Sequence, residues 1–242
     1  MRMKKYIVTG ATSGVGEALV KSFKGDDVQI IAIGRNESKL ERLKAFMSSS
    51  QCITVNIDLC EVESIKDKIS SYLEDVDGFI HCAGFTKLTS LRKASYSLYL
   101  KMMNVNYFSF AELVKLITLK KSKERHLRII GISSCASIIG FKSNYIYAST
   151  KAAMDAFVRN VALDLAPQNV EINTIQPWYI DTPMMSNLKE VYGSDLNNAI
   201  LYPQVLGLIS VDDMVEEIRF LLNKKSTKVS GTAIKINAGF IF

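Results

Sequence analysis

A glycine-rich turn between a short strand and a helix near the N-terminus most strongly constrains how this chain can fold. Residues 6–9 have the β-branched and aromatic composition of a buried strand, and an amphipathic helix begins soon after them. Glycines let a backbone approach a pyrophosphate, and a helix N-terminus offers free amides and a positive dipole end. We therefore predict a dinucleotide-binding turn, with a plain tight turn as the alternative. Its predicted contacts are Gly10, Thr12, Ser13, Gly14, Val15 and Gly16.

Strand patterns alternate with helical patterns along the rest of the chain. Further strands are predicted over 28–33, 53–57, 76–81, 127–132, 173–176 and 232–236, with helices over 38–46, 62–73 and 97–121, and from about Tyr145. A last helix is predicted to begin at Ser210, capped by that serine with Asp213 three residues on. This order predicts an α/β fold, a doubly wound Rossmann-type parallel sheet of about seven strands with helices on both faces. No linker, repeat or low-complexity stretch divides the sequence, so we expect one catalytic domain over 1–242.

The second predicted strand ends at an arginine, where NAD-binding folds usually carry a carboxylate that holds the ribose hydroxyls. Arg35 could pair with a 2′-phosphate in bidentate fashion, or it could be a solvated residue at the next helix. We predict NADP as the cofactor, with NADPH preferred over NADH. Asp58 and Leu59 follow the third strand, where the carboxylate could accept from the adenine amine, cap the next helix, or do both.

The composition excludes several classes of partner. The net charge is only +6, and the lysine clusters fall near termini or helix ends, where cations suit the helix dipole. We therefore predict no nucleic-acid partner, with attraction of phosphates or an acidic carrier protein as another use of these lysines. No secretion signal or membrane-spanning run occurs, so we predict no membrane partner and a cytoplasmic location.

Metal chemistry is also not expected from this sequence. The four cysteines form no Cys-x-x-Cys pair, and the chain has only two histidines. Cys82 and Cys135 lie in or beside apolar strand patterns and are expected to be reduced, partly buried thiols. We predict no metal site.

A tyrosine and a lysine stand four residues apart, at Tyr147 and Lys151, which places them on one face of a helix. A free phenol has a pKa of about 10, and an adjacent ammonium favours the phenolate and lowers that value. Such a pair could supply an acid or base near neutral pH. Taken alone, the same pair could also be two ordinary residues of a helix surface.

The motifs together resemble the short-chain dehydrogenases/reductases of the single-domain type, over nearly the whole chain. Thr9 to Gly16 is similar to the family's Thr-Gly-x-x-x-Gly-x-Gly loop. Cys82, Ala83 and Gly84 are similar to its Asn-Ala-Gly segment, where small residues would let the cofactor ribose lie against a strand end. The similarity to the family's catalytic set falls on Asn106, Ser134, Tyr147 and Lys151.

The resemblance implies a role for each of these four residues. Tyr147 would donate a proton to the substrate carbonyl oxygen, or act as a base in oxidation, while Ser134 would hold the same oxygen. Lys151 would lower the tyrosine pKa and grip the nicotinamide ribose, so that Tyr147 and Lys151 also bind the cofactor. Asn106 would hold a water that relays protons between Lys151 and solvent.

Two positions depart from the family's pattern. Cys82 stands where the family usually has asparagine, and its thiol lacks the amide that would lie near the ribose. Trp178, the single tryptophan, follows Pro177 where the family usually has glycine, so its indole could reshape the pocket or merely pack the loop. Ile180 and Thr182 match the positions that meet the nicotinamide carboxamide.

The last quarter is expected to cover and complete the site. By resemblance, residues 183–208 would form a flap whose methionines and tyrosines suit an apolar or amphipathic substrate. The apolar tail 240–242 would be buried against another subunit of a homodimer or homotetramer.

We interpret the chain as an NADP(H)-dependent oxidoreductase that interconverts a ketone and a secondary alcohol. Its substrate would be a small-molecule or carrier-bound carbonyl compound, and a 3-oxoacyl thioester is one candidate because carrier-protein reductases share this length and layout. One alternative is a catalytically silent NADP(H)-binding sensor, which Cys82 and Trp178 favour and the intact four-residue set disfavours. Another is an epimerase or dehydratase, whose family members are usually longer.

Overall fold

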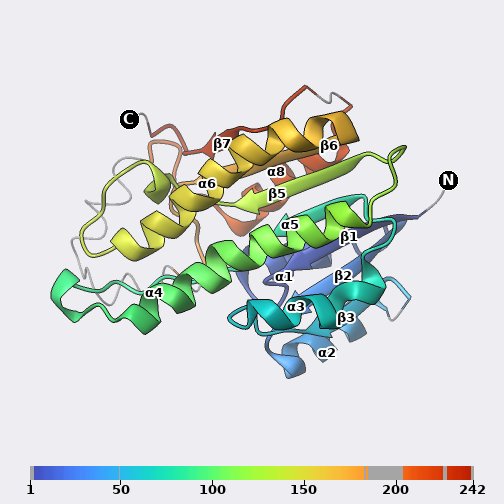
Figure 1. The fold of residues 1–242 in the computed structure, drawn as a ribbon, viewed down its shortest axis with the longest axis horizontal. Coiled ribbons are helices and arrows are strands. Elements are labelled where there is room, and N and C mark those ends of the chain that lie inside the picture. The colour runs from blue at the N-terminus through green and yellow to red at the C-terminus, as the bar shows by residue number, and fades with distance from the viewer. Residues whose placement is uncertain (1–2, 49, 183, 185–203, 226–227, 241–242) are drawn as a thin grey trace.

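The computed structural model describes residues 3–48, 50–182, 184, 204–225 and 228–240. One parallel sheet of seven strands runs in the order β3-β2-β1-β4-β5-β6-β7 (Figure 1). The strands are β1 Lys4–Thr9, β2 Val28–Gly34, β3 Cys52–Asn56, β4 Gly78–His81, β5 Leu127–Ile132, β6 Val170–Pro177 and β7 Ala233–Ile236. The predicted doubly wound Rossmann-type fold is confirmed.

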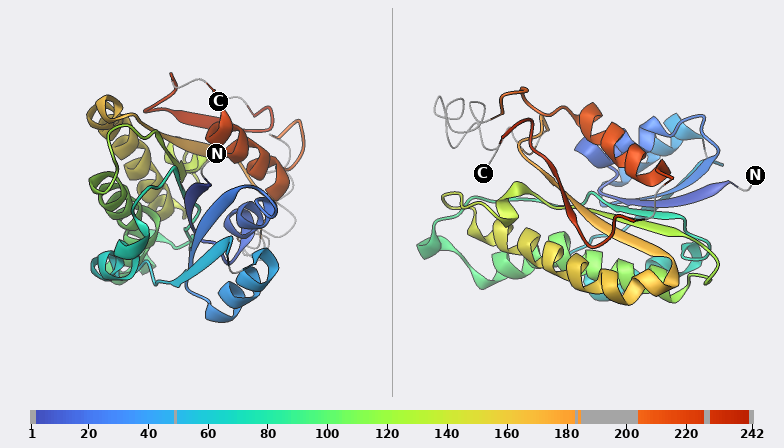
Figure 2. Two further views of the ribbon diagram at one scale, coloured as in Figure 1. Left: turned by 90° about the vertical axis from the view of Figure 1, so that its right-hand side faces the viewer. Right: turned by 90° about the horizontal axis from the view of Figure 1, so that it is seen from above.

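Helices cover both faces of the sheet. The α-helices are α1 Gly14–Ser22, α2 Glu37–Met47, α3 Ile65–Ile69, α4 Tyr96–Met103, α5 Ser109–Leu119, α6 Tyr145–Leu165 and α8 Val211–Asn223. Helices α1, α2 and α8 lie on one face, and α3, α5 and α6 lie on the other (Figure 2). Shorter helical turns are η1 Val62–Ser64, η2 Ser70–Tyr72, η3 Leu91–Lys93, η4 Asn104–Phe108, η5 Cys135–Ser137 and η6 Ala166–Gln168.

Each face of the sheet has its own apolar core, because successive side chains of a strand point to opposite faces. On β1, Ile7 packs into the core that contains Phe110 of α5, and its neighbour Val8 packs into the core that contains Leu19 of α1 and Met214 of α8. A strand buried on both faces reads as a continuous apolar run, as residues 6–9 do. The sheet therefore forms a rigid support for the loops at its carboxyl edge.

Two predicted helices are interrupted in the structure. The long helix expected over 97–121 is divided into α4 and α5 by a π-helical turn at η4, and Asn106 within that turn is fully buried. The helix expected over 62–73 is divided into η1, α3 and η2, because 3₁₀ turns tighten both of its ends. The helical periodicity of these stretches was correct, but the local hydrogen-bond register could not be predicted from it.

Other expectations meet the limits of the described chain. The predicted flap over 183–208 falls largely outside it, since residues 183 and 185–203 are not described. Among the described residues, no helix is both long and apolar enough to cross a membrane. The single catalytic domain over 1–242, the cytoplasmic location and the homodimer or homotetramer stay predictions.

Helix α8 begins at a complete capping box, as its sequence predicted. The Ser210 hydroxyl accepts a hydrogen bond from the Asp213 amide at 3.0 Å, and the Asp213 carboxylate accepts from the Ser210 amide at 2.7 Å. These bonds satisfy two amides that have no partner within the helix. Helix α8 packs Met214 and Ile218 into the core beside α1. A stable start of α8 therefore helps to hold the core on this face of the sheet.

We predict that Ser210→Ala lowers the free energy of unfolding by about 1 kcal/mol, because the N-cap acceptor is lost. In a chain of this size the melting temperature should fall by about 2–4 °C, as measured by circular dichroism. The control is Ser149→Ala, an exposed serine within α6 whose loss should change stability by less than about 0.5 kcal/mol. Equal effects of the two substitutions would contradict a specific role for the cap.

Candidate active site

The carboxyl edge of the sheet opens into a cavity of about 200 Å³, to which loops after β1, β4, β5 and β6 and the start of α6 contribute. Twelve of the predicted site residues line it: Ser13, Gly14, Val15, Cys82, Gly84, Ser134, Tyr147, Lys151, Pro177, Trp178, Ile180 and Thr182. The parallel strands explain this convergence, because their carboxyl ends all meet at one edge of the sheet.

A second hollow, of about 310 Å³, continues the site past Gly84, which lines both. It contains the remaining predicted cofactor residues except Gly16, namely Gly10, Thr12, Arg35, Asp58, Leu59 and Ala83. It lies where β1 separates β2 from β4, the point at which the order of strands in the sheet reverses direction. Ligands of doubly wound folds bind at such switch points.

The glycine-rich turn is shaped by contacts that a side chain would destroy. A Cβ on Gly10, where φ is +68°, would lie 2.8 Å from the Ala83 amide nitrogen. A Cβ on Gly16 would lie 2.4 Å from the Gly10 carbonyl oxygen, so Gly16 lets helix α1 pack directly against the turn. Gly16 lines neither hollow and has a packing position in the structure, and its predicted contact with the cofactor stays a prediction.

Arg35 lines the second hollow, just after β2. Its guanidinium lies 3.7 Å from the Asp58 carboxylate, and 70% of its side chain is exposed. An exposed pair of this kind contributes little to stability. Backbone and side-chain contacts with Cys60, together with Arg35, lower the pKa of Asp58 against the opposing effect of burial. Because its side chain is mostly exposed and its pair with Asp58 is weak, the Arg35 guanidinium remains accessible to an anion.

Lys151 carries a desolvated ammonium in the middle of the site. Its side chain is 3% exposed, and Nζ donates a hydrogen bond of 2.6 Å to the Ile132 carbonyl oxygen at the end of β5. Burial lowers the pKa of Lys151 to about 8, while Asp155 and Cys82 raise it. A Cβ on Gly84 would lie 3.5 Å from Nζ, within ordinary contact distance, so Gly84 lies directly beside the ammonium.

Tyr147 and Ser134 face the same cavity, but the predicted lowering of the tyrosine pKa is wrong for this structure. Burial raises the pKa of Tyr147 to about 12, a hydrogen bond with Ser134 lowers it, and Cys135 raises it. The Lys151 ammonium lies 5.6 Å from the centre of the Tyr147 ring and is bonded to Ile132 instead. Burial is therefore the largest influence on this phenol, which stays protonated at neutral pH.

Asn106 lines neither hollow and joins three elements behind the site. Its Nδ2 donates to the Phe85 carbonyl oxygen and to the Thr150 hydroxyl, each at 3.0 Å. Its Oδ1 accepts from the Phe85 amide at 3.0 Å. Both amide hydrogens are thus used in binding the loop after β4 to helix α6. The side chain directly fixes the residue next to Lys151, and its predicted role in a proton relay stays a prediction.

Sequence reasoning missed a buried histidine beneath the glycine-rich turn. His81 Nδ1 lies 2.9 Å from the Thr9 hydroxyl, which in turn accepts from the Ala83 amide at 3.3 Å. Burial and, to a smaller extent, Lys151 lower the pKa of His81 to about 3, so the imidazole is neutral. The pair ties the carboxyl ends of β1 and β4 together. Only the register of two strands distant in sequence could have revealed it.

The cavity also contains residues that were not predicted. They include Thr86, Leu88, Ile132, Ser133, Cys135, Ala136, Phe141, Asn144 and Tyr179, while Met184 comes from the predicted flap. Several come from the loop between β5 and α6, in which the sequence had pointed only to Ser134. Among the described residues, no group of three or more His, Cys, Asp or Glu side chains is placed to hold a metal ion.

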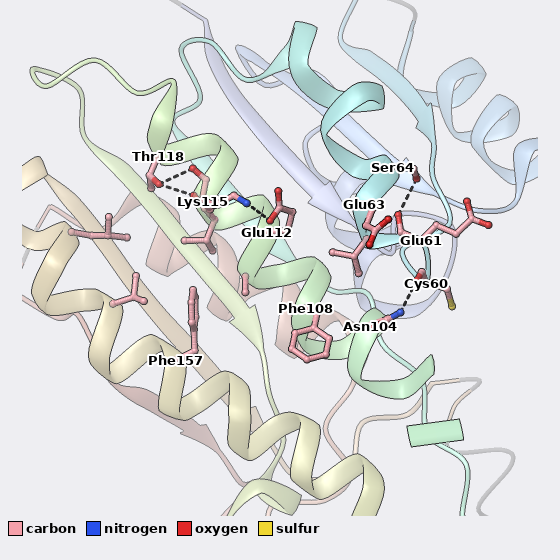
Figure 3. Close-up of a pocket in the computed structure, with 15 residues that line it drawn as sticks. Cys60, Glu61, Glu63, Ser64, Asn104, Phe108, Glu112, Lys115, Thr118 and Phe157 are labelled. Atoms are coloured by element: carbon pink, nitrogen blue, oxygen red, sulfur yellow. Dashed lines mark hydrogen bonds and ion pairs between the residues drawn. The ribbon is translucent and has the colours of Figure 1, made fainter. Parts of the chain in front are cut away.

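A larger hollow, of about 960 Å³, lies elsewhere, beside η1, η4, α5 and α6 (Figure 3). Its lining includes Phe108 and Phe157, the Glu112–Lys115 ion pair, and Cys60, whose carbonyl oxygen accepts from Asn104 at 2.8 Å. None of the predicted catalytic residues reaches it. The size of this hollow therefore does not mark it as the active site. The convergence of polar groups favours the smaller cavity at the sheet edge.

The chain was compared with known proteins. The family model described as short chain dehydrogenase matches residues 4–193. Among curated proteins, the chain is 24% identical over 239 residues to a 3-oxoacyl-[acyl-carrier-protein] reductase of Escherichia coli K12, covering 98% of this chain and 96% of that protein. It is 25% identical over 242 residues to L-xylulose reductase of Bos taurus, with coverages of 98% and 96%. The solved structure "ElxO with NADP Bound" superposes with a TM-score of 0.83 at 22% identity, covering 98% of each chain.

The buried ammonium should give the protein a characteristic dependence of stability on pH. Since burial lowers the Lys151 pKa to about 8 from an ordinary 10.5, the unfolded chain binds more protons than the folded chain between these values. Below pH 8 the buried charge therefore lowers the free energy of unfolding by its full amount. This loss of stability decreases as pH rises from about 8 to about 10.5. We predict that Lys151→Met is more stable than wild type at pH 7, and that this advantage shrinks by pH 10.

Urea denaturation of both proteins at pH 7 and pH 10 measures this difference. Lys115→Met is the matched control, because Lys115 is an exposed lysine of α5 paired with Glu112. Its stability difference from wild type should be small and should barely change over the same interval. A pH-independent difference between wild type and Lys151→Met would show that the ammonium is not desolvated in the fold.

Proposed function

The chain belongs to the short chain dehydrogenase family, as its motifs predicted, and we propose that it interconverts a ketone and a secondary alcohol with NADP(H). Enzymes of this family are oxidoreductases that act on alcohol and carbonyl groups. The observation that carries the proposal is the convergence of Ser134, Tyr147 and Lys151 on one cavity that the glycine-rich turn also lines.

The residues present fit a dinucleotide. The turn around Gly10 and Gly14 brings the backbone and the N-terminus of α1 to the hollow without a Cβ in the way, which is how folds of this kind receive a pyrophosphate. Arg35 would meet a 2′-phosphate at one end, and Lys151 would hold ribose hydroxyls at the other. When bound, the cofactor supplies or accepts the hydride.

The chain's own residues handle the proton. Tyr147, with its pKa raised to about 12, is protonated across the neutral range and can donate to a carbonyl oxygen that gains negative charge. The Ser134 hydroxyl shares this side of the cavity and would hydrogen-bond the same oxygen, which orients the carbonyl and stabilises the developing charge. In the oxidative direction the same phenol would receive the proton after its own ionisation.

Lys151 acts on this chemistry through its charge and its position. With a pKa of about 8, Lys151 is protonated in most molecules at pH 7. Its positive charge favours transfer of a proton away from Tyr147. Its bond to Ile132 and the support of Asn106 through Phe85 and Thr150 fix it at the back of the cavity. Asn106 is therefore proposed as a positioning residue.

The substrate is proposed only as a small-molecule or carrier-bound ketone. The similar proteins include reductases named for a 3-oxoacyl carrier-protein compound and for L-xylulose, which differ widely in polarity. A 3-oxoacyl thioester is one candidate for this chain. A screen of NADPH oxidation with keto-acyl thioesters, keto sugars, quinones and steroid-like ketones, with NADH in parallel, would identify the class.

We predict that Tyr147→Phe lowers turnover by about 10²–10⁴-fold or more, because the proton donor is lost while the ring and fold are kept. Turnover is measured as NADPH oxidation with the best ketone of the screen. Cofactor binding is measured separately, by energy transfer from Trp178, the single tryptophan, to NADPH. Binding should change little in the variant.

The matched control is Tyr145→Phe, which removes a hydroxyl two residues away on the same helix, outside the cavity lining. Its turnover should stay close to that of wild type. Full activity of Tyr147→Phe would refute the assignment of the proton donor. Tight binding of NADPH by wild type, without turnover of any ketone, would favour the sensor alternative.

We predict that Arg35→Ala weakens NADPH binding by about 10–100-fold and leaves NADH binding nearly unchanged, since a charged hydrogen bond to phosphate contributes about 1.5–3 kcal/mol. Titration of both cofactors by energy transfer from Trp178 measures the ratio. Arg42→Ala removes an exposed arginine of α2 that bonds the Ser38 carbonyl oxygen, and it serves as the control. Parallel losses for NADPH and NADH would contradict a 2′-phosphate contact at Arg35.

A further inference from the structure

Four aromatic side chains from three separate segments form a cluster at one side of the cavity. Phe141 comes from the loop before α6, Trp178 and Tyr179 follow β6, and Phe240 follows β7. The rings of Trp178 and Phe240 stack with centroids 4.1 Å apart and an interplanar angle of 29°. Tyr179 meets Trp178 at 89° and 5.6 Å, and Phe141 meets it at 57° and 5.5 Å.

The indole of Trp178 is held in one orientation. Phe240 covers one ring face, Tyr179 and Phe141 pack at an angle to it, and the side chain is only 6% exposed. The Trp178 amide donates a 2.9 Å hydrogen bond to the Ile236 carbonyl oxygen, which fixes its backbone beside β7. A residue packed this densely cannot swing aside to admit a bulky group. Trp178 is thus a fixed surface.

This fixed surface belongs to the cavity that contains the proton donor. Trp178, Phe141 and Tyr179 all line the same 200 Å³ cavity as Ser134 and Tyr147. A carbonyl oxygen held by Ser134 and Tyr147 would therefore direct its substituent into a cavity with three aromatic side chains in its lining. Aromatic rings favour other rings in offset-stacked or edge-to-face arrangements, beyond the contribution of their apolar area.

We propose that the preferred substrate is a ketone that bears a flat aromatic group next to the carbonyl, and that Trp178 selects it. This inference rests on the proposed carbonyl chemistry of the same site. Phe240 is the positioning residue, because it touches the indole and does not line the cavity itself. The aryl group packs against Trp178 with Phe141 and Tyr179 at its edges, while a puckered saturated ring of similar size makes poorer contact.

Acetophenone and cyclohexyl methyl ketone test this selection, because they differ mainly in the flatness of the ring. The quantity measured is the ratio of kcat/KM for acetophenone to that for cyclohexyl methyl ketone, with NADPH. The comparison between wild type and variants cancels the different intrinsic reactivities of the two ketones. We expect Trp178→Leu to lower the ratio about threefold to tenfold, mostly through KM, and Trp178→Phe to keep it within about twofold, since a smaller ring remains.

Phe240 is tested with the same ratio. Phe240→Leu should lower the ratio of kcat/KM values, by less than Trp178→Leu does. Phe240→Tyr should keep the ratio near that of wild type, because a stacked ring is retained. Phe220→Leu, an exposed phenylalanine of α8, is the matched control and should leave the ratio unchanged. Circular dichroism establishes whether each variant is folded, and the Phe240 pair carries the test if Trp178→Leu does not fold.

The outcomes separate this inference from the proposed function. Turnover of both ketones with the same ratio in wild type, Trp178→Leu and Phe240→Leu overturns the aromatic selection and leaves the carbonyl chemistry standing. Failure of wild type to reduce any ketone of the wider screen contradicts the proposed function itself. A fall of the ratio in both leucine variants, with recovery in Trp178→Phe and Phe240→Tyr, supports the selection.

Discussion

The desolvated ammonium of Lys151 is the interaction on which the rest of the site depends. A cation can remain in an apolar interior only if its hydrogen bonds are met, and here the Ile132 carbonyl oxygen meets one at 2.6 Å. Asp155 raises its pKa from one turn farther along α6. The arrangement sacrifices stability at neutral pH to keep a positive charge beside a phenol, as functional sites commonly do.

The parallel sheet supplies the precision that this charge requires. Thr9 pairs in register with Ile33 on one side and His81 on the other, so the ends of three strands lie level. The buried contact between Thr9 and His81 holds two of those ends together from beneath. Asn106 then connects the loop after β4 to α6, which carries Tyr147 and Lys151. The proposed binding surface and the proposed proton donor are thereby fixed to one rigid support.

Local patterns revealed the fold and most of the site, because each needs only neighbours in sequence. The strand at 127–132, the capped start of α8, the glycine turn and the Tyr147–Lys151 spacing are all of this kind. The neutral His81, the packing position of Gly16 and the aromatic cluster around Trp178 depend on contacts between distant segments. The pKa of Tyr147 was predicted in the wrong direction because burial, which no spacing reveals, raises it.

The π-helical turn between α4 and α5 constrains how this stretch can change in evolution. The π-helical turn at Asn104–Phe108 holds one residue more than an α-helical turn does. Each residue of an α-helix corresponds to a rotation of about 100° around the helix axis. Loss or gain of a single codon here would rotate α4 against α5 and move Asn106 away from Phe85 and Thr150. Insertions and deletions are therefore expected to be excluded from this segment among descendants that keep the chemistry, while substitutions on its exposed side remain acceptable.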